Sequence, residues 1–185
     1  TDEAVRGYDP RFKVNPPLRT ADDVTALRRG LADGTIDVVG TDHAPHPRES
    51  KDCEWAGAAF GMTGLETALA VVADAMLSGD YGAFDWADMA RVFSSAPARI
   101  GRVGDQGRPL AVGEPANIAL IDPAARWTVR PSELATASEN TPFFDRGLNC
   151  RVIATFLRGD PTVLDGASVP RAAERTSGLA TEATS

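Results

Sequence analysis

Residues 41–46, with the sequence TDHAPH, constrain the fold and the function of this chain more than any other segment. They follow a short apolar run at residues 36–40, IDVVG, which has the pattern of a buried β-strand. Barrel enzymes keep their catalytic side chains directly after the C-terminal ends of strands. A carboxylate and two imidazoles at this position therefore predict a strand followed by a loop that carries chemistry.

A second unusual cluster, residues 13–19 (KVNPPLR), precedes the first by the length of one βα unit. It follows a short strand-like stub at residues 12–14. Thr20 is a good N-cap for the segment that comes next, and Asp23 stands three residues on as a capping-box partner. The apolar spacing that follows predicts a helix that ends at Gly34.

The middle of the chain alternates between a long irregular segment and two amphipathic segments. Residues 42–61 show no periodicity and carry proline, glycine and mixed charge, so we expect a long loop of the kind that is functional or disordered. Apolar residues recur at helical spacing from Leu65 to Met76, which predicts a helix. A further helix is expected to begin near Asp85 and to stop before Pro97.

From about residue 107 the pattern changes to short β-like runs separated by Gly, Pro and Asp. The runs are residues 118–121, 127–129 and 152–157. We expect residues 1–106 to form one α/β unit and residues 107–170 to form a small β-rich domain. Residues 171–185 are small, polar and rich in Thr and Ala, and we expect them to form a disordered tail.

Three segments together resemble the dihydroorotases, amidohydrolases of pyrimidine biosynthesis. They are KVNPPLRT from residue 13, DGTIDVVGTDHAPH from residue 33 and FGMTGLETAL from residue 60, and the resemblance continues through SSAPARI and GEPANIALID to about Asp165. It implies an α/β fold: the last two strand–helix units of a (β/α)8 TIM-type barrel, with a small appended β-sheet domain. Allantoinases and hydantoinases look similar overall but usually lack the Asn before the Pro pair and the final His of DHAPH, so a cyclic-amidohydrolase of that type is the alternative.

The resemblance also predicts that a large part of the enzyme is missing from this chain. Amidohydrolases of this type bind one or two zinc ions through an early His-x-His, a middle Asp or modified Lys and two later His. This chain has two histidines in total, and both lie in residues 41–46. A complete barrel takes about 250 residues, and the chain has 185 without an initiator Met. We therefore expect a fragment that begins after the sixth barrel strand, with the remaining ligands upstream, so that these residues alone hold no catalytic zinc.

Asp42 is the candidate catalytic residue. A carboxylate directly after a strand can ligate a metal and exchange a proton with bound water, although a turn-capping Asp has the same position. The resemblance implies that Asp42 contacts the zinc site, takes a proton from the attacking water and passes it to the leaving amide nitrogen. His43 should point elsewhere because side chains alternate along a strand, and we expect it to hold the loop.

Four residues are candidates for substrate binding. Asn15 offers a donor and an acceptor to an amide-bearing ring, or is simply a residue held in a turn before proline. The resemblance implies that His46 binds the substrate carboxylate, whereas the alternative is a surface histidine. Glycine allows close approach of the backbone to a ligand, and the resemblance implies that main-chain groups of Phe60 and Gly61 bind the pyrimidine ring rather than serving as core anchor and hinge.

Charge and hydropathy exclude several classes of function. The net charge of −7 argues against nonspecific nucleic-acid binding, which needs clustered Lys and Arg. No apolar run approaches the ~18 residues of a membrane span. Cys53 and Cys150 lack metal-site spacing, which favours a reduced cytoplasmic setting. Lys13 and Arg19 are either steering charges for an anionic substrate or solvated surface charges.

Partners follow from the resemblance. It implies a small-molecule substrate, carbamoyl aspartate or dihydroorotate, and in the complete protein a homodimer or a complex with aspartate transcarbamoylase. Some dihydroorotase-like chains have lost their metal ligands and serve only as structural partners of aspartate transcarbamoylase. The presence of Asp42, Asn15 and His46 argues against that third alternative.

Overall fold

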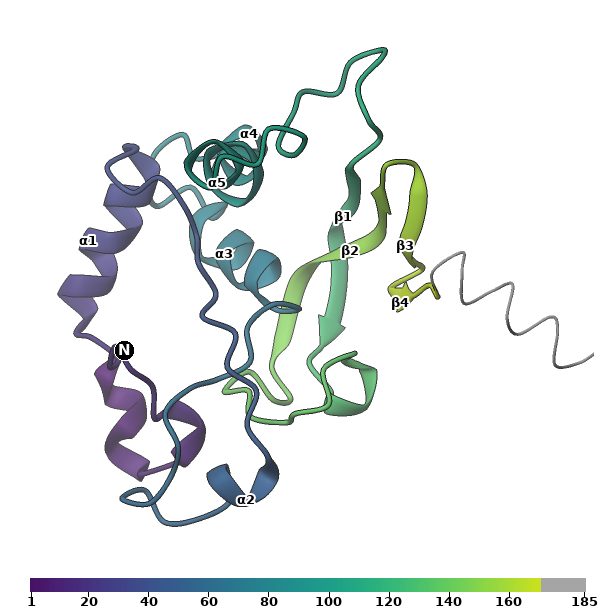
Figure 1. Cartoon of the computed structure of the whole chain (residues 1–185). Coiled ribbons are helices and arrows are strands. Elements are labelled where there is room, and N and C mark those ends of the chain that lie inside the picture. Colours follow the sequence, from purple (N-terminus) through teal and green to yellow (C-terminus); the bar gives the residue numbers. More distant parts are fainter. Residues whose placement is uncertain (171–185) are drawn as a thin grey trace, which may run out of the picture.

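The computed structural model of the chain describes residues 1–170. Short helices and long loops form its N-terminal part, and an antiparallel sheet forms its C-terminal part (Figure 1). The helices are η1 (Asp2–Gly7), η2 (Pro10–Phe12), α1 (Ala21–Ala32), α2 (Arg48–Lys51), α3 (Ala68–Met76), α4 (Trp86–Ala90), the π-helical η3 (Arg91–Ser95), α5 (Ala96–Ile100) and η4 (Pro131–Glu133). The strands are β1 (Ile118–Thr128), β2 (Gly147–Leu157), β3 (Asp160–Leu164) and β4 (Ala167–Ser168). No helix within the described residues is long and apolar enough to cross a membrane, and the expected tail at residues 171–185 lies outside them.

Helix α1 confirms the predicted capping box. The Thr20 hydroxyl accepts a bond from the Asp23 main-chain N–H at 3.3 Å, and the Asp23 carboxylate accepts one from the Thr20 N–H at 3.2 Å. The helix ends at Asp33, and Gly34 follows with φ 82°, a left-handed conformation that glycine adopts without strain. Both ends of this helix were therefore readable from local sequence.

The next two helices differ from their predicted bounds. Helix α3 begins at Ala68 rather than Leu65. Residues 65–67 form a turn that leads into it, with the Ala68 N–H bonded to the Gly64 carbonyl at 2.9 Å, and Leu65 is 64% exposed. The helix expected to stop before Pro97 instead continues through α5 to Ile100. The wider π-helical turn of η3 precedes the proline and relieves the clash between its ring and the carbonyl of the preceding turn.

The two predicted barrel strands are absent from the described residues, which corrects the expectation for residues 12–14 and 36–39. Residues 10–12 form η2, and residues 36–40 run irregularly between α1 and α2 (Figure 1). The Val39 N–H donates to the Val92 carbonyl at 3.1 Å and the Ile36 N–H to the Gly30 carbonyl at 2.8 Å. A strand needs a neighbouring strand to complete its ladder, and here the main chain bonds to helical segments instead.

The C-terminal part of the described chain forms a four-stranded sheet in the region where short β-runs were predicted. Its strand order is β1-β2-β3-β4, with every neighbouring pair antiparallel. The runs predicted at residues 118–121 and 127–129 are joined into one strand, β1, by a register shift between Asp122 and Arg126. Pro123 lies in this bulge and donates no hydrogen bond, while the Asp122 carboxylate accepts bonds from the N–H groups of Ala124 and Ala125.

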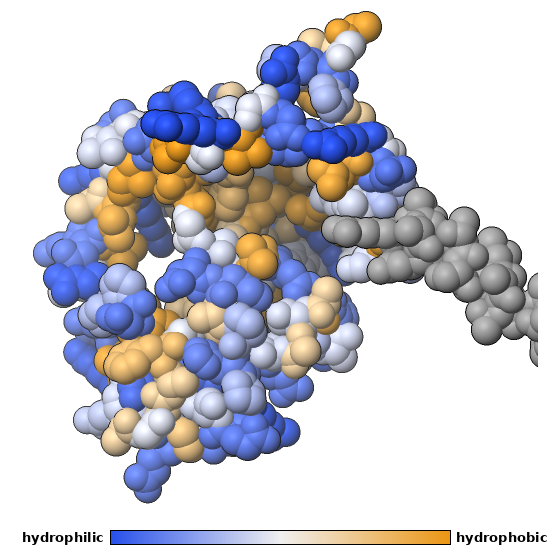
Figure 2. Space-filling view, in the orientation of Figure 1, coloured by the Kyte–Doolittle hydropathy of each residue, from blue (hydrophilic) through white to orange (hydrophobic). Residues whose placement is uncertain are grey.

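The sheet shares its core with the helices. One cluster joins Leu31, Ala73, Met76, Phe84, Met89 and Val92 to Cys150 of β2, and a second joins Ala70 to Val129 and Leu148. Helix α3 lies against the sheet and contributes to both clusters (Figure 1). Apolar side chains also gather in a hollow between α1 and the sheet (Figure 2). Both clusters thus contain residues from before and after residue 107. The division of the chain into residues 1–106 and 107–170 stays a prediction.

Candidate functional site

Three segments that are distant in the sequence meet where the predicted site residues lie. The Ala44 N–H donates to the Met62 carbonyl at 2.9 Å, and His43 and Met62 form an isolated parallel bridge. The Gly61 N–H donates to the Lys13 carbonyl at 3.0 Å. The loops at residues 41–46 and 60–64, which we call the site loops, therefore lie side by side, and the segment before Asn15 lies next to them.

Gly61 permits this close approach. Its φ of 132° is strained for any other residue, and a Cβ added there would lie 2.7 Å from the Ala44 Cβ and 3.0 Å from His46 Nε2. Its N–H bonds to Lys13, and its carbonyl accepts bonds from Lys51 and Asn140. Both main-chain groups thus have partners within the chain, and their predicted contact with substrate stays a prediction.

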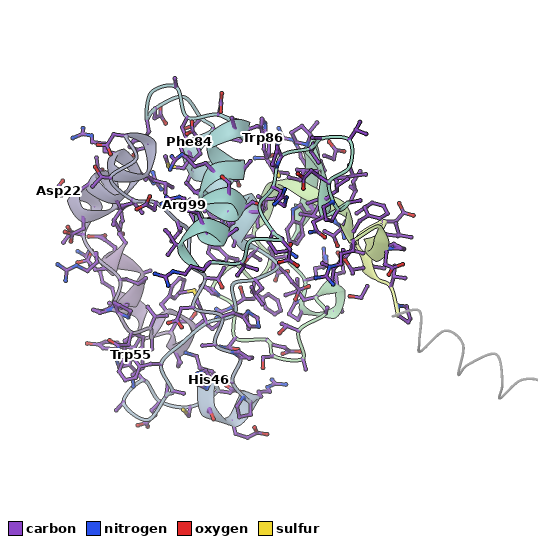
Figure 3. The ribbon with its side chains drawn as sticks, turned by 45° about the horizontal axis from the view of Figure 1, so that its top comes forward. Asp22, His46, Trp55, Phe84, Trp86 and Arg99 are labelled. Carbon is purple, nitrogen blue, oxygen red and sulfur yellow. The ribbon has the colours of Figure 1, made fainter. Side chains whose placement is uncertain are left out.

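His46 links the two site loops. Its Nε2 lies 2.8 Å from the Phe60 carbonyl, and because a carbonyl only accepts, Nε2 carries the proton of this bond. Figure 3 shows His46 close to helix α2. The imidazole lines an open cavity of about 240 Å³, together with Asp9, Arg11, Arg48, Lys51, Asp52, Glu139 and Asn140. Positively and negatively charged side chains thus line the cavity beside His46, the predicted substrate-binding histidine.

Asp42 and Asn15 are exposed at the same group of loops. Asp42 has φ 42°, a left-handed conformation that aspartate tolerates better than most residues. Within residues 1–170, neither side chain has a hydrogen-bond partner. Both polar groups are therefore available to a ligand, as their predicted roles require.

His43 has a structural environment, in agreement with the expectation that it holds the loop. Its Nδ1 accepts bonds from the N–H groups of Gly64 at 3.1 Å and Leu65 at 3.2 Å. Its Nε2 lies 3.4 Å from the Thr136 hydroxyl. Both ring nitrogens are thus engaged, which leaves neither for a metal.

The described residues do not make a complete metal site. Within residues 1–170, no three His, Cys, Asp or Glu side chains are grouped so that they could hold a metal ion. A catalytic zinc takes three protein ligands and a water. Asp42 alone is a candidate ligand, so the residues present do not fit a zinc site by themselves.

Lys13 is neither a steering charge nor a solvated surface charge. It is buried, its Nζ donates to the carbonyls of Trp55 at 2.7 Å and Ala56 at 3.1 Å, and Nζ lies 4.7 Å from the centre of the Phe60 ring. Arg19, by contrast, is exposed and pairs with Asp23 at 3.2 Å. Lys13 therefore holds the loop at residues 55–60 against the segment that carries Asn15.

Lys51 and Asn140 are the site residues that sequence reasoning missed. Both are buried, yet a lysine in a mixed-charge loop is indistinguishable from a surface residue, and Asn140 lies 94 residues from its partner His46. Burial, followed by the positive charge of Lys13, lowers the pKa of Lys51 against the opposing effect of Asp9. The spatial pairing of these residues leaves no local pattern in the sequence.

Known relatives extend over most of this chain. The model of the amidohydrolase family matches residues 14–162. The chain is 58% identical over 167 residues to a dihydroorotase from Leifsonia xyli and 58% identical over 166 residues to one from Streptomyces coelicolor, in each case covering 90% of this chain and 38% of the relative. A dihydroorotase from Mycobacterium tuberculosis is 53% identical over 165 residues, 89% of this chain and 38% of that protein. The chain thus spans 38% of the length of these curated relatives.

Solved structures show the same fold. A D-hydantoinase (dihydropyrimidinase) from Thermus sp. superposes with a TM-score of 0.76 at 25% identity, covering 88% of this chain and 36% of that one. An L-hydantoinase (dihydropyrimidinase) from Arthrobacter aurescens superposes with a TM-score of 0.79 at 24% identity, covering 92% of this chain and 38% of that one. Fold and family model agree, and the chain belongs to the amidohydrolase family.

Proposed function

We propose that this chain forms the C-terminal portion of a dihydroorotase, which interconverts N-carbamoyl-L-aspartate and L-dihydroorotate in pyrimidine biosynthesis. The observation that carries the proposal is the 58% identity to dihydroorotases of Leifsonia and Streptomyces over 90% of the chain. In this proposal, residues 1–106 form the C-terminal part of the enzyme's TIM-type barrel, and residues 12–14 and 36–39 pair as strands only with the rest of that barrel. Residues 107–170 supply the appended sheet.

Asp42 is the proposed proton carrier. In the hydrolytic direction, water adds to the ring amide carbonyl, and the Asp42 carboxylate accepts the proton that the water loses. The C–N bond then breaks, and Asp42 returns the proton to the departing nitrogen, which becomes the NH2 of the carbamoyl group. The other product is a carboxylic acid, which releases its proton to solvent and becomes a carboxylate. The exposed Asp42 carboxylate, which is unpaired within residues 1–170, supports this role because no internal bond competes with the water.

Asn15, His46, Phe60 and Gly61 are the proposed substrate-binding residues. The convergence of residues 13–15 with the site loops supports this grouping. Because His46 Nε2–H already bonds to the Phe60 carbonyl, Nδ1 is the ring nitrogen left to face the substrate carboxylate. The side-chain amide of Asn15 donates one hydrogen bond to the ring amide of the substrate and accepts another from it.

The complete enzyme is proposed to hold one or two zinc ions, with Asp42 as the contact from this chain and the other ligands outside it. The reaction is assigned to the cytoplasm. In the complete protein, a homodimer or a complex with aspartate transcarbamoylase is the proposed assembly.

A hydantoinase-type cyclic amidohydrolase is the second candidate, and the fold of the two hydantoinases favours it. Their identity to this chain is 24–25%, whereas the named dihydroorotases reach 53–58%. Asn15 and His46 also distinguish the two readings. We therefore place the dihydroorotase first.

A substrate panel on the full-length protein tests the proposal. We expect zinc-dependent turnover of L-dihydroorotate and carbamoyl aspartate, and little or none of hydantoin or allantoin. Preference for hydantoin would favour the second candidate. A metal-free, inactive protein that binds aspartate transcarbamoylase would favour the non-catalytic alternative.

A second assay addresses the division of the enzyme. Residues 1–185 alone should bind no catalytic zinc and show no activity, because three protein ligands are needed. Co-expression with the upstream part of the same enzyme should restore a zinc-containing, active complex. Zinc-dependent cyclisation by purified residues 1–185, free of full-length enzyme, would overturn this division.

A further inference from the structure

The carbonyl of Gly61 accepts hydrogen bonds from two buried side chains of different segments. Lys51 Nζ donates to it at 2.9 Å and Asn140 Nδ2 at 3.3 Å. Lys51 also donates to the carbonyls of Ala59 at 2.9 Å and Lys13 at 3.2 Å, so all three donors of its ammonium group are used. Its side chain is 7% exposed, although it ends a helix of only four residues.

Asn140 connects both site loops through one side chain. Its Nδ2 also donates to the Ala44 carbonyl at 2.9 Å, and its Oδ1 accepts from the His46 N–H at 3.1 Å. Its own main-chain carbonyl accepts from the Thr63 N–H at 3.0 Å. The residue is 4% exposed, so these bonds are largely shielded from water in the folded chain.

We propose that Lys51 and Asn140 are positioning residues that act together as a clamp on the Gly61 carbonyl and thereby set the placement of Gly61 and His46 for substrate. The proposal rests on the proposed dihydroorotase function for the identity of the substrate. Among residues 1–170, the main-chain pairing between the site loops is the bridge of His43 and Met62, with its bond from the Ala44 N–H to the Met62 carbonyl. The His46 ring bonded to the Phe60 carbonyl and the His43 ring bonded to the Gly64 N–H also join the loops, and the clamp adds constraints at Gly61 itself.

The chemistry of the two side chains suits this task. A buried carbonyl that loses its donor bears the full desolvation penalty, and bonds from a charged donor are stronger than neutral ones. Lys51 satisfies three carbonyls from the segments before Asn15 and around Gly61, while Asn140 satisfies the carbonyls of Ala44 and Gly61. The two side chains thus connect all three segments of the site.

Steady-state kinetics and hydrogen exchange on the full-length protein test the clamp. Lys51→Met and Asn140→Ala should each raise KM for L-dihydroorotate about tenfold or more, with kcat changed less than about threefold and zinc content unchanged. Amide exchange should accelerate at residues 59–64 and remain unchanged in β1 and β2. Because both side chains act on one carbonyl, the double variant should lose less than the product of the single effects.

Matched controls and a milder variant keep the test decisive. Glu49→Met on the same helix alters an exposed side chain and should leave KM and exchange unchanged. Asn149→Ala on β2 removes a bond to Asp74 of α3 and should leave KM and exchange at residues 59–64 unchanged. If Lys51→Met does not fold, Lys51→Arg retains charge and donors in a different geometry and should give an intermediate rise in KM and in exchange.

The outcomes separate the two proposals. A wild-type protein without dihydroorotase activity would refute the proposed function, while exchange at residues 59–64 would still decide on the clamp. An active wild type whose Lys51 and Asn140 variants keep both KM and loop exchange would overturn the clamp. Acceleration spread equally over the site loops, α3 and the sheet would also overturn it, because it would show a general structural role.

Discussion

The C-terminal sheet and the site loops satisfy their main chains in different ways. In the sheet, β1 and β2 pair along most of their length, so main-chain donors and acceptors bond to one another. In the site loops, the side chains of Lys51, His43 and Asn140 bond to main-chain groups instead. Where this chain contains both strands of a pair, the backbone forms a ladder. Where the described residues lack one strand of a pair, polar side chains bond to the main-chain groups instead.

The difference has an energetic consequence. The sheet is held by apolar burial, with Val129 and Leu148 almost fully buried, and each such side chain contributes about 1.5–3 kcal/mol. The site loops are held by hydrogen bonds, each with a net contribution of about 0.5–1.5 kcal/mol, or about 1.5–3 kcal/mol where the donor is charged. We therefore expect the site loops to open locally before the sheet does.

The largest expected effect is on kcat, from a substitution that removes the proposed proton acceptor and keeps the shape of the side chain. In the full-length protein, Asp42→Asn should abolish turnover and keep the fold, because the amide cannot accept the proton. The loss in kcat should be at least about 10²–10⁴, equal to roughly 3–5 kcal/mol of transition-state stabilisation. Steady-state kinetics measure the loss of turnover, and circular dichroism shows whether the fold is kept.

Asp22→Asn is the matched control, since Asp22 is an exposed aspartate on α1 (Figure 3). It should leave kcat unchanged. If Asp42→Asn retains more than about a tenth of wild-type kcat, Asp42 is not the proton carrier.

The same contrast separates what the sequence could predict from what it could not. The capping box of Thr20 and Asp23 and the β-runs of the sheet were predictable, because their partners are local or carry the period of a strand. The strand expected at residues 36–39 failed because strand pairing depends on a neighbour that the described chain does not provide.

The predicted site residues could be located from sequence motifs. The residues that support them could not. Asn15, Asp42 and His46 stand in contiguous motifs that resemblance identifies. Asn140 and Lys51 act through carbonyls of distant residues, and any main chain supplies a carbonyl. Such contacts impose no residue type on their partners, so they leave no pattern in the sequence.

Truncating the sheet core gives the second-largest effect. Leu148→Ala should destabilise the protein by about 2–5 kcal/mol, because it removes a 2% exposed side chain from a cluster with Ala70 and Val129. Hydrogen exchange should accelerate in β2 and α3 together, since they share that cluster. Acceleration confined to the site loops would contradict the assignment of the stable core to the sheet.

A side chain at Gly61 should have a smaller and local effect. Gly61→Ala places a Cβ 2.7 Å from the Ala44 Cβ at φ 132°, so we expect a cost of about 1–3 kcal/mol and faster exchange in the site loops. Gly147→Ala is the control in the sheet, where an added Cβ meets nothing within 4 Å. If both variants behave alike, the close approach of the site loops is not a constraint.

The smallest expected effect is the loss of stability in acid through two ion pairs, one beside the site and one beside the sheet. The bonds from Arg11 hold the pKa of Asp9 below its ordinary 3.8, and those from Arg158 do the same for the pKa of Asp105. Because the folded-state pKa is lowered, each contribution to stability is present above pH 3.8 and is lost as the pH falls through the folded value. Asp9 has the less exposed side chain, 28% against 47%, so it should contribute more, up to about 1 kcal/mol. Denaturation curves between about pH 5 and pH 2.5 should show a flatter acid limb for Asp9→Asn than for Asp105→Asn. A reversed order would show that the loop beside the site is not the more acid-sensitive region.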